Sequence, residues 1–309
     1  MRRRRRPGGR LRGAAVGLAL SEVAPALPDE LHPVARFGSA MTLVEEALWR
    51  DEREAGVAYA AVGLVLGAIG GRALGSTAAA VSVTAAGGQL RRTALDIHDR
   101  LVAGDLDGAR AALPALVGRD PSALDASGVA AAVIESVAEN SVDAVFAPAL
   151  WAALAGPAGA GALRAVNTMD AMVGHRSERH ERFGWAAARA DDLANLVPAR
   201  CFAAAVWALA PAERRPDILR AIRQDAPVHP SPNAGVAEAA VAGALGLELG
   251  GPLRYGDRTE DRPTLGSGPR PGAHDIVRAC ELAARAQWLL VGGLGALGLV
   301  APLGRRGRR

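Results

Sequence analysis

Lysine is absent from this 309-residue chain, so all 36 of its basic residues are arginine. A Walker A loop contains a lysine that reaches the phosphates of a nucleotide, and its absence excludes that way of holding one. A guanidinium group instead matches phosphate and carboxylate groups with two parallel hydrogen bonds. Any bound phosphate is therefore expected to be held outside such a loop, with arginine as the candidate cation.

Cysteine is scarce as well. Only Cys201 and Cys280 are present, without a CxxC pair, and two ligands are too few for a zinc or iron–sulfur site. The six histidines are scattered and form no HExxH motif. We expect two buried thiols rather than a disulfide.

A nucleic-acid-binding module is also missing, despite a net charge of +4. The arginine runs lie at the ends of the chain, without interleaved aromatic residues or a helix-turn-helix signature. They predict a basic N-terminal tail over 1–12 and a basic C-terminal tail over 304–309, both cytoplasmic, because positive residues flank membrane spans on that side. We expect no binding of nucleic acid.

Hydrophobic residues make up 50% of the chain and cluster in long runs. A helix needs about 20 apolar residues to cross a bilayer. Strand signals are scarce, so the sequence predicts an all-α, multi-pass integral membrane protein, with about 4–6 spans and with polar helices and loops at the cytoplasmic face. A single membrane-embedded domain over 1–309 is expected, with a Pro/Gly-rich loop over 251–274. The runs expected in or at the membrane are 13–27, 55–88, 144–166, 196–212, 234–250 and 286–303.

Two sets of glycines predict close helix packing. Gly63, Gly67, Gly71 and Gly75 fall four residues apart, a spacing that allows helices to approach closely in lipid. The GxGxxG pattern of residues 293–298 has no strand before it, so helix packing explains it better than a dinucleotide site does.

Polar residues recur at helical spacing between residues 135 and 200, on segments otherwise rich in small apolar residues. Ordinary ion pairs with the nearby arginines are one interpretation. However, a network of ion pairs needs no amide, whereas a metal–phosphate site uses carboxylates for the cation and amides or arginine for oxygens. We therefore favour a metal–phosphate site. The clusters are Glu135, Glu139 and Asp143; Asn167 and Asp170; and Asp191, Asp192 and Asn195.

The same stretch resembles the CobD/CbiB family of cobalamin biosynthesis, whose members are membrane-embedded adenosylcobinamide-phosphate synthases. The similarity extends from about His32 to Asp275. It is carried by ESVAENSVDAVFAP (135–148), RAVNTMDAMVGHRSERHERFGWAAARADDLANLVPAR (164–200), HPVARFG (32–38), GRDPSAL (118–124), HPSPNAG (229–235) and VAGALGLELGGPLRYG (241–256).

The resemblance implies amide formation between adenosylcobyric acid and (R)-1-amino-2-propanol or its O-phosphate, with ATP and Mg²⁺ activating the carboxylate through an acyl phosphate. It further implies a location in the cell membrane, contact with membrane lipid, and assembly with itself or with other cobalamin-biosynthesis enzymes. Family members usually carry a GDP tripeptide before HPV. This chain lacks it, and Glu22 or Asp29 is the candidate replacement.

This chemistry assigns roles to the polar residues. The predicted metal ligands are Glu135, Glu139, Asp143 and Asp170. Glu139, Asp191 and Asp192 are the predicted catalytic residues, with Asp191 or Asp192 as a base or as a ligand of a second metal. The predicted substrate-binding residues are Asn140, Asn167 and Asn195 for phosphate or the amino-alcohol, Arg176, Arg179 and Arg200 for phosphate, and His32, Ser231 and Asn233.

Two other functions fit the residues alone. An intramembrane, Mg²⁺-dependent prenyl- or phospho-transferase would use similar acid and amide clusters, but its DDxxD-like repeats are missing. A transporter would also explain polar residues in apolar helices, although neither an inverted repeat nor enough spans are seen.

Overall fold

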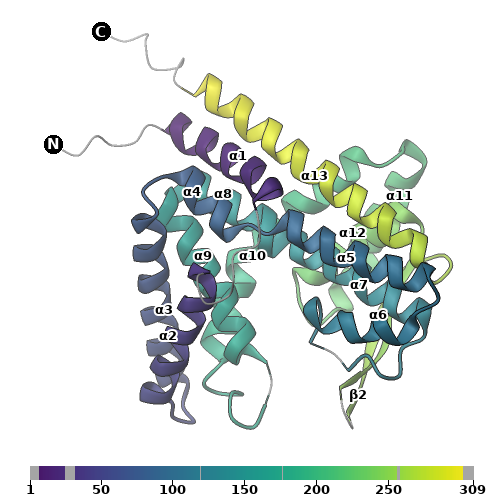
Figure 1. The fold of residues 1–309 in the computed structure, drawn as a ribbon, viewed down its shortest axis with the longest axis horizontal. Helices are drawn as coiled ribbons and strands as arrows, with labels where there is room; N and C mark the ends of the chain where they lie inside the picture. The colour runs from purple at the N-terminus through teal and green to yellow at the C-terminus, as the bar shows by residue number, and fades with distance from the viewer. Residues whose placement is uncertain (1–6, 25–31, 119, 176, 256–257, 302–309) are drawn as a thin grey trace. The chain divides into compact units, whose positions relative to one another are not determined.

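The computed structural model describes residues 7–24, 32–118, 120–175, 177–255 and 258–301. In these ranges the regular structure is helical except for one two-stranded hairpin (Figure 1), which confirms the predicted class of helical membrane protein. The chain forms two compact units: Met1–Ala86, Asp143–Pro198 and Leu290–Arg309 build unit 1, and Gly87–Val142 and Ala199–Leu289 build unit 2. A single domain over the whole chain stays a prediction.

Unit 1 is built around the packing of α9 along α3. Its core contains Met41, Tyr59, Met169 and Phe183, and the rings of Tyr59 and Phe183 lie 5.1 Å apart between centroids. The helices of unit 1 are α1 (Pro7–Val23), α2 (Pro33–Leu48), α3 (Arg53–Ala73), α4 (Thr77–Thr84), α8 (Ala147–Ala155), α9 (Pro157–Met169), the first half of α10 (Trp185–Leu209) and the end of α13 (Ala273–Val300).

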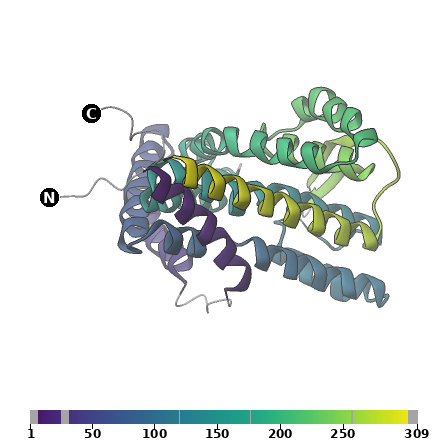
Figure 2. The same cartoon turned by 90° about the horizontal axis from the view of Figure 1, so that it is seen from above.

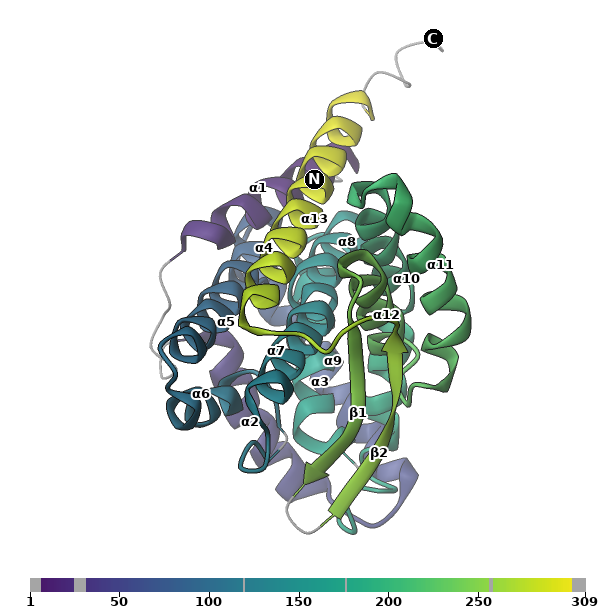
Figure 3. The ribbon, with the colours of Figure 1, turned by 90° about the vertical axis from the view of Figure 1, so that its right-hand side faces the viewer.

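Unit 2 combines shorter helices with the hairpin, whose strands run side by side in Figure 3. It contains the second half of α10 and most of α13. Its other elements are α5 (Gly87–Val102), α6 (Leu106–Ala112), α7 (Ala126–Ser141), α11 (Arg215–Gln224), α12 (Ala234–Leu245), the strands β1 (Glu248–Tyr255) and β2 (Arg258–Gly266), and the short 3-10 turns η1 (Leu113–Ala115), η4 (Ala212–Arg214) and η5 (Ala226–Val228).

The hairpin corrects the prediction of a loop over 251–274. Strands β1 and β2 pair antiparallel from Glu248 opposite Gly266, with an irregularity between Gly250 and Gly251. Both of these glycines have positive φ, +79° and +94°, which only glycine adopts readily. Leu249 and Leu265 are fully buried. The burial of these two side chains stabilises the base of the hairpin, although the Gly- and Pro-rich sequence there is typical of a loop.

Three helices of the described chain are long and apolar enough to cross a membrane: α3, α10 and α13. This is fewer than the four to six spans predicted, because three of the six apolar runs do not form single long helices. The run 13–27 lies partly in α1, which has 17 residues. Residues 144–166 are divided at Gly156, where φ is +72°, and the run from residue 234 ends its helix at Leu245. The run 55–88 divides at Gly75 into α3 and the short α4.

Apolar side chains on these three helices face outward. Val65 and Ile69 of α3, Leu193 and Val197 of α10, and Leu297 of α13 are each at least half exposed. Exposed apolar surface of this extent is unfavourable in water and favourable against lipid tails. The outward faces therefore support the assignment as a membrane protein.

Glycines allow α3 and α9 to touch, as their spacing predicted. A Cβ atom at Gly67 would collide with the Cβ of Ala165 and lie 2.6 Å from the carbonyl oxygen of Gly161. Gly63 lies against Met169 of α9, and Gly71 lies against Pro157 and Gly161 of the same helix. Gly75 has a different role, because its φ of +76° makes the turn after α3.

The glycines of the GxGxxG pattern lie inside α13, as expected, but only one of them takes part in a close contact with another helix. Gly298 fits against α1, where a Cβ would lie 2.6 Å from Cγ of Arg12, whereas Gly293 and Gly295 face open space. The end of α13 accordingly runs beside α1 (Figures 1 and 2).

Cys201 and Cys280 are both free thiols. Cys280 is buried as predicted, whereas Cys201 is partly exposed, which corrects the prediction that both thiols are buried.

Candidate functional site

An acid flanked by two amides is the most distinctive polar group of unit 1. Asp191 and Asn195 lie one turn apart on α10, and Asn167 reaches them from α9. The amide nitrogen of Asn167 donates to Oδ1 of Asp191 at 2.6 Å, and that of Asn195 donates to the same oxygen at 3.1 Å. Three residues predicted from sequence to bind or act on substrate are thus in direct contact.

The orientation of both amides leaves acceptor oxygens without donors. Because each NH₂ group faces the carboxylate, rotating either amide would place oxygen against oxygen, so the orientation is fixed electrostatically. Asn195 is completely buried, and Oδ1 of Asn167 and Oδ1 of Asn195 are buried without a hydrogen-bond partner in the described structure. Such atoms are unfavourable unless a donor or a cation is supplied. The cluster is therefore suited to a positively charged group with N–H donors, or to a cation.

Arg164 lies one turn before Asn167 on the same face of α9. Its guanidinium interacts electrostatically with Asp143, and its Nε is buried without a hydrogen-bond acceptor. Residues three apart on a helix have neighbouring side chains. Unit 1 thus places a guanidinium group, which interacts with an acid as the ion-pair interpretation suggests, one turn from the acceptor-rich cluster.

The predicted metal ligands Asp143 and Asp170 each lie in a π-helical turn. Asp143 belongs to η2 (Val142–Phe146) and Asp170 begins η3 (Asp170–Gly174). The carboxylate of Asp170 lies so close to Gly174 that no Cβ would fit there. Single π turns are frequent at functional sites, which gives both acids a structural distinction that helical spacing does not reveal.

The neighbours of the cluster are held by surface and backbone contacts. Asp192 points to Arg189, with a distance of 3.0 Å between Oδ2 and Nη1. The indole nitrogen of Trp151 on α8 donates to the carbonyl oxygen of Ala194 at 3.0 Å. Helix α10 is therefore fixed to α8 at the turn that carries Asp191 and Asn195.

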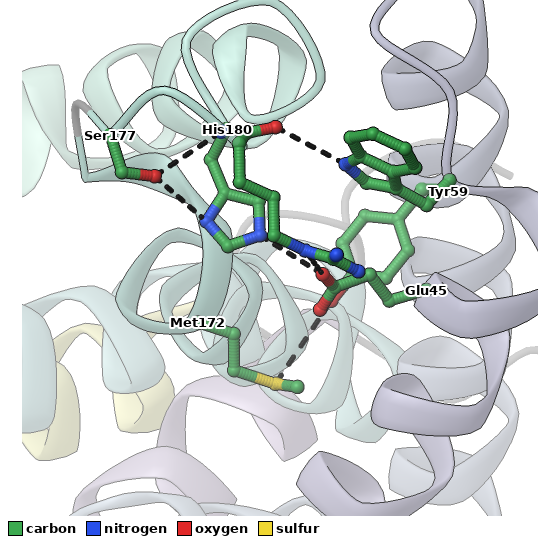
Figure 4. Close-up of polar contacts among 7 residues, drawn as sticks. Glu45, Tyr59, Met172, Ser177 and His180 are labelled. Carbon is green, nitrogen blue, oxygen red and sulfur yellow. Dashed lines mark hydrogen bonds and ion pairs between the residues drawn. The ribbon is translucent and has the colours of Figure 1, made fainter.

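A second polar network, drawn in Figure 4, holds the loop between η3 and α10 against α2. Oε1 of Glu45 lies 2.9 Å from Nε2 of His180 and accepts from Nε of Arg179 at 3.2 Å. Ser177 lies 3.3 Å from the other ring nitrogen of His180, and the Arg179 guanidinium stacks on Trp49 at 4.7 Å. Arg179, predicted to clamp phosphate, is thus engaged by Glu45. The predicted phosphate ligand Arg176 lies outside the described residues.

We expect Glu45→Gln to release this loop. The substitution removes the charge that strengthens two hydrogen bonds, which contribute about 1.5–3 kcal/mol each when one partner is charged. Trypsin should therefore cleave after Arg179 or Arg182 about tenfold faster, since proteolysis follows local opening. Glu46→Gln is the matched control, because Glu46 is exposed one position away. Equal cleavage of both variants would contradict a role for Glu45 in holding the loop.

In unit 2, the predicted metal ligand Glu135 serves the hairpin. Its Oε1 accepts from the backbone nitrogen of Gly250 at 2.8 Å, and Arg270 donates to the carbonyl oxygen of Gly250 at 2.7 Å. The amide of Asn140, predicted to bind substrate, donates to the carbonyl and hydroxyl oxygens of Ser136 one turn earlier. Both side chains therefore have structural partners within unit 2, and Glu139 lies on the same helix, α7.

Three further predicted residues meet at the start of α12. Arg200 donates to Oδ1 of Asn233 at 2.9 Å. Oγ of Ser231 accepts from the backbone nitrogens of Asn233 and Ala234 at 3.3 and 3.2 Å, so Ser231 holds the turn that leads into α12. His32 has a similar role in unit 1, where its ring accepts from the backbone nitrogen of Val34 at the start of α2.

The structure thus divides the predicted site residues between the two units. Unit 1 holds His32, Asp143, Asn167, Asp170, Arg179, Asp191, Asp192 and Asn195, and unit 2 holds Glu135, Glu139, Asn140, Arg200, Ser231 and Asn233. Within the described residues, no three His, Cys, Asp or Glu side chains are arranged to hold a metal ion. The roles assigned to the individual acids stay predictions.

Comparison with known proteins gives a consistent result. The model of a family described as CobD/Cbib protein matches residues 14–283. A protein named Cobalamin biosynthesis protein CobD, from Mycobacterium tuberculosis (strain CDC 1551 / Oshkosh), is 47% identical over 269 residues, 82% of this chain and 85% of the relative. A protein of the same name from Rhodobacter capsulatus is 48% identical over 204 residues, which cover 66% of this chain and 63% of the relative. Another of that name, from Sinorhizobium fredii, is 40% identical over 290 residues, which cover 84% of this chain and 89% of the relative. No solved structure matches the chain.

Proposed function

The chain belongs to the CobD/CbiB family and is a cobalamin-biosynthesis enzyme, and from that premise we propose that it is an amide-forming ligase. It joins adenosylcobyric acid to (R)-1-amino-2-propanol or its O-phosphate, which gives adenosylcobinamide or its phosphate. The observation that carries this proposal is the acceptor-rich cluster of Asn167, Asp191 and Asn195.

The proposed reaction has two steps. The carboxylate of adenosylcobyric acid receives the terminal phosphoryl group of ATP, and ADP leaves. The amine nitrogen then attacks the carbonyl carbon of the acyl phosphate, the bond from that carbon to the phosphate oxygen breaks, and orthophosphate departs. Starting from the ammonium form, the nitrogen loses two protons, one before the attack and one with the departing phosphate.

The cluster in unit 1 is the proposed site of the amine. An ammonium group has three N–H donors and no acceptor. Asn167 and Asn195 each offer an oxygen without a donor, and Asp191 offers its carboxylate. Asp191 would therefore hold the ammonium group and accept the proton that it must lose before attack, as a general base does.

Arg164 is the proposed partner of a phosphate on the amino-alcohol, because it lies one turn from Asn167. We expect Arg164→Gln to raise KM for aminopropanol O-phosphate by roughly tenfold, the effect of one charge-assisted hydrogen bond, with KM for aminopropanol unchanged. Steady-state assays with both amines measure this. An equal rise for both substrates, or a large fall in the melting temperature, would assign Arg164 a structural role.

Magnesium is proposed only as the ion that accompanies ATP. Among the described residues no group of three His, Cys, Asp or Glu side chains could hold a metal ion, and Glu135 is hydrogen-bonded to Gly250. When bound, Mg²⁺ would neutralise the phosphates of ATP. No step above depends on where it binds.

The proposed location is the cell membrane, with both termini on the cytoplasmic side. The three long apolar helices support membrane insertion, and the arginine-rich ends support the orientation. Membrane lipid, further copies of the chain and other cobalamin-biosynthesis enzymes are the proposed partners. No nucleic-acid partner is proposed, because the arginine runs at the ends of the chain come without a nucleic-acid-binding module.

An assay on detergent-solubilised, purified protein tests the ligase. Adenosylcobyric acid, ATP and Mg²⁺ are supplied with either amine, and corrinoid products and ADP are quantified by chromatography and mass spectrometry. We expect amide product and ADP in equal amounts, both dependent on adenosylcobyric acid and an amine. Product without ADP would reject activation by ATP, and neither product nor ADP with either amine would reject the ligase.

A further inference from the structure

A surface cavity of about 470 Å³ lies in unit 2, where α10 ends and α11 begins. Trp207 of α10 forms one part of its wall, and Arg215, Arg220 and Arg223 of α11 form another. Pro216 and Leu219 contribute apolar surface between the arginines. The cavity therefore combines concentrated positive charge with an apolar lining.

Carboxylates of the described chain do not neutralise these three arginines. Arg215 stacks on Trp207, with its guanidinium carbon 4.8 Å from the ring centroid, and donates to the carbonyl oxygen of Ala208 at 3.3 Å. Arg220 donates to the hydroxyl of Ser267 at 2.6 Å. Arg223 is exposed and forms no ion pair with the described part of the chain. The nearby Asp217 is paired with Arg214 instead.

The Nε atom of Arg215 adds a second indication of a ligand. It is buried and has no hydrogen-bond acceptor among the described residues, although the rest of this guanidinium is held in place by Trp207 and Ala208. A buried donor without an acceptor is unfavourable. An anionic oxygen in the cavity would remove that penalty.

The cavity lies at the end of a candidate membrane span. Helix α10 is long and apolar enough to cross a bilayer, and Trp207 is two residues before its end. Tryptophan is enriched where a span meets the lipid headgroups, and arginines clustered next to a span bind anionic headgroups. Trp207 and Leu219 are each 37% exposed, which leaves apolar surface for the glycerol and acyl part of a lipid.

We infer that this cavity binds the phosphate headgroup of an anionic phospholipid. The phosphate would lie among Arg215, Arg220 and Arg223, and the acyl chains would follow Trp207 and Leu219 towards the bilayer. Charge complementarity and the position at the end of α10 favour a lipid over a soluble phosphate. The binding is independent of the ligase proposal and requires no substrate.

Lipid retention by the full-length protein tests this inference. Wild-type protein is purified in mild detergent, offered phosphatidylglycerol or phosphatidylcholine, and examined by native mass spectrometry. Arg220→Gln combined with Arg223→Gln is compared with a control of equal charge, Arg100→Gln combined with Arg110→Gln, whose arginines pair with Asp96 and Asp107 at the surface of unit 2. Melting temperatures with inorganic phosphate or ATP form a separate arm.

We expect wild-type protein and the control to retain phosphatidylglycerol in preference to phosphatidylcholine. The cavity variant should bind phosphatidylglycerol roughly 30-fold more weakly, since each arginine near the surface contributes about 1 kcal/mol. Equal retention of both lipids by the wild type, or unchanged retention by the cavity variant, would overturn the inference. Stabilisation by phosphate or ATP that depends on these arginines, without lipid preference, would assign the cavity to a soluble anion instead.

Discussion

Replacing Asp191 with asparagine should lower kcat/KM for the amino-alcohol by about a hundredfold or more. The new side chain has the same shape but cannot pair with an ammonium group or accept its proton. Losing one member of a buried, hydrogen-bonded charge pair costs about 2–5 kcal/mol, which corresponds to a fall of about 30- to 5,000-fold in kcat/KM. Initial rates at varied amine concentration measure the effect, with saturating adenosylcobyric acid and ATP.

The pH dependence of this defect separates chemistry from folding. A primary amine has a pKa of about 10, so the uncharged amine, which needs neither a charge partner nor a base, becomes more abundant as the pH approaches that value. The deficit of Asp191→Asn should therefore shrink between pH 7 and pH 9.5. Asp96→Asn removes an exposed carboxylate paired with Arg100 and should keep normal rates. A deficit that stays constant with pH would contradict the role of Asp191.

Gly67→Leu should destabilise unit 1 by about 3 kcal/mol or more. The backbone of α9 lies against Gly67, and the atoms that a side chain would meet include the carbonyl oxygen of Gly161, which cannot move without displacing the helix. Overpacking of a close contact costs about 1–3 kcal/mol, occasionally more. A fall of roughly 10 °C in melting temperature is expected in detergent, together with lower yield of folded protein.

Gly70→Leu is the matched control for this prediction. It changes the same residue type on the same helix, but a Cβ at Gly70 meets no atom within 4 Å. The control should melt within a few degrees of the wild type. If both leucine variants behaved alike, helix propensity rather than the contact between α3 and α9 would explain the effect.

The features of the fold that could be predicted are those that depend on local pattern. The apolar runs 55–88 and 286–303 show directly that α3 and α13 are long and apolar. The four-residue spacing of Gly63, Gly67 and Gly71 places these glycines on one face of a helix. The hairpin could not be predicted, because distant side chains fix its base: Glu135 and Arg270 at Gly250, and Asp225 at Gly266. Local composition there indicates a loop.

The candidate site was predictable in part for the same reason. The one-turn spacing of Asp191 and Asn195 is local, and the recurrence of amides beside acids led to Asn167, although the contact itself joins residues on two helices. The buried Nε of Arg164 depends on packing, and Glu45 holds a loop more than 130 positions away. Neither relation leaves a periodic signal in the sequence.

The pairing of α1 with the end of α13 affects how the protein is synthesised. Gly298 receives Arg12 and Gly8 of α1, yet nearly all of the described chain is translated between these two segments. At about 5–20 residues per second, a ribosome would need tens of seconds to supply the missing neighbour. During that interval α1 has to be shielded by bilayer, by translocon or by α4 and α8, and unit 1 can be completed only after translation of α13.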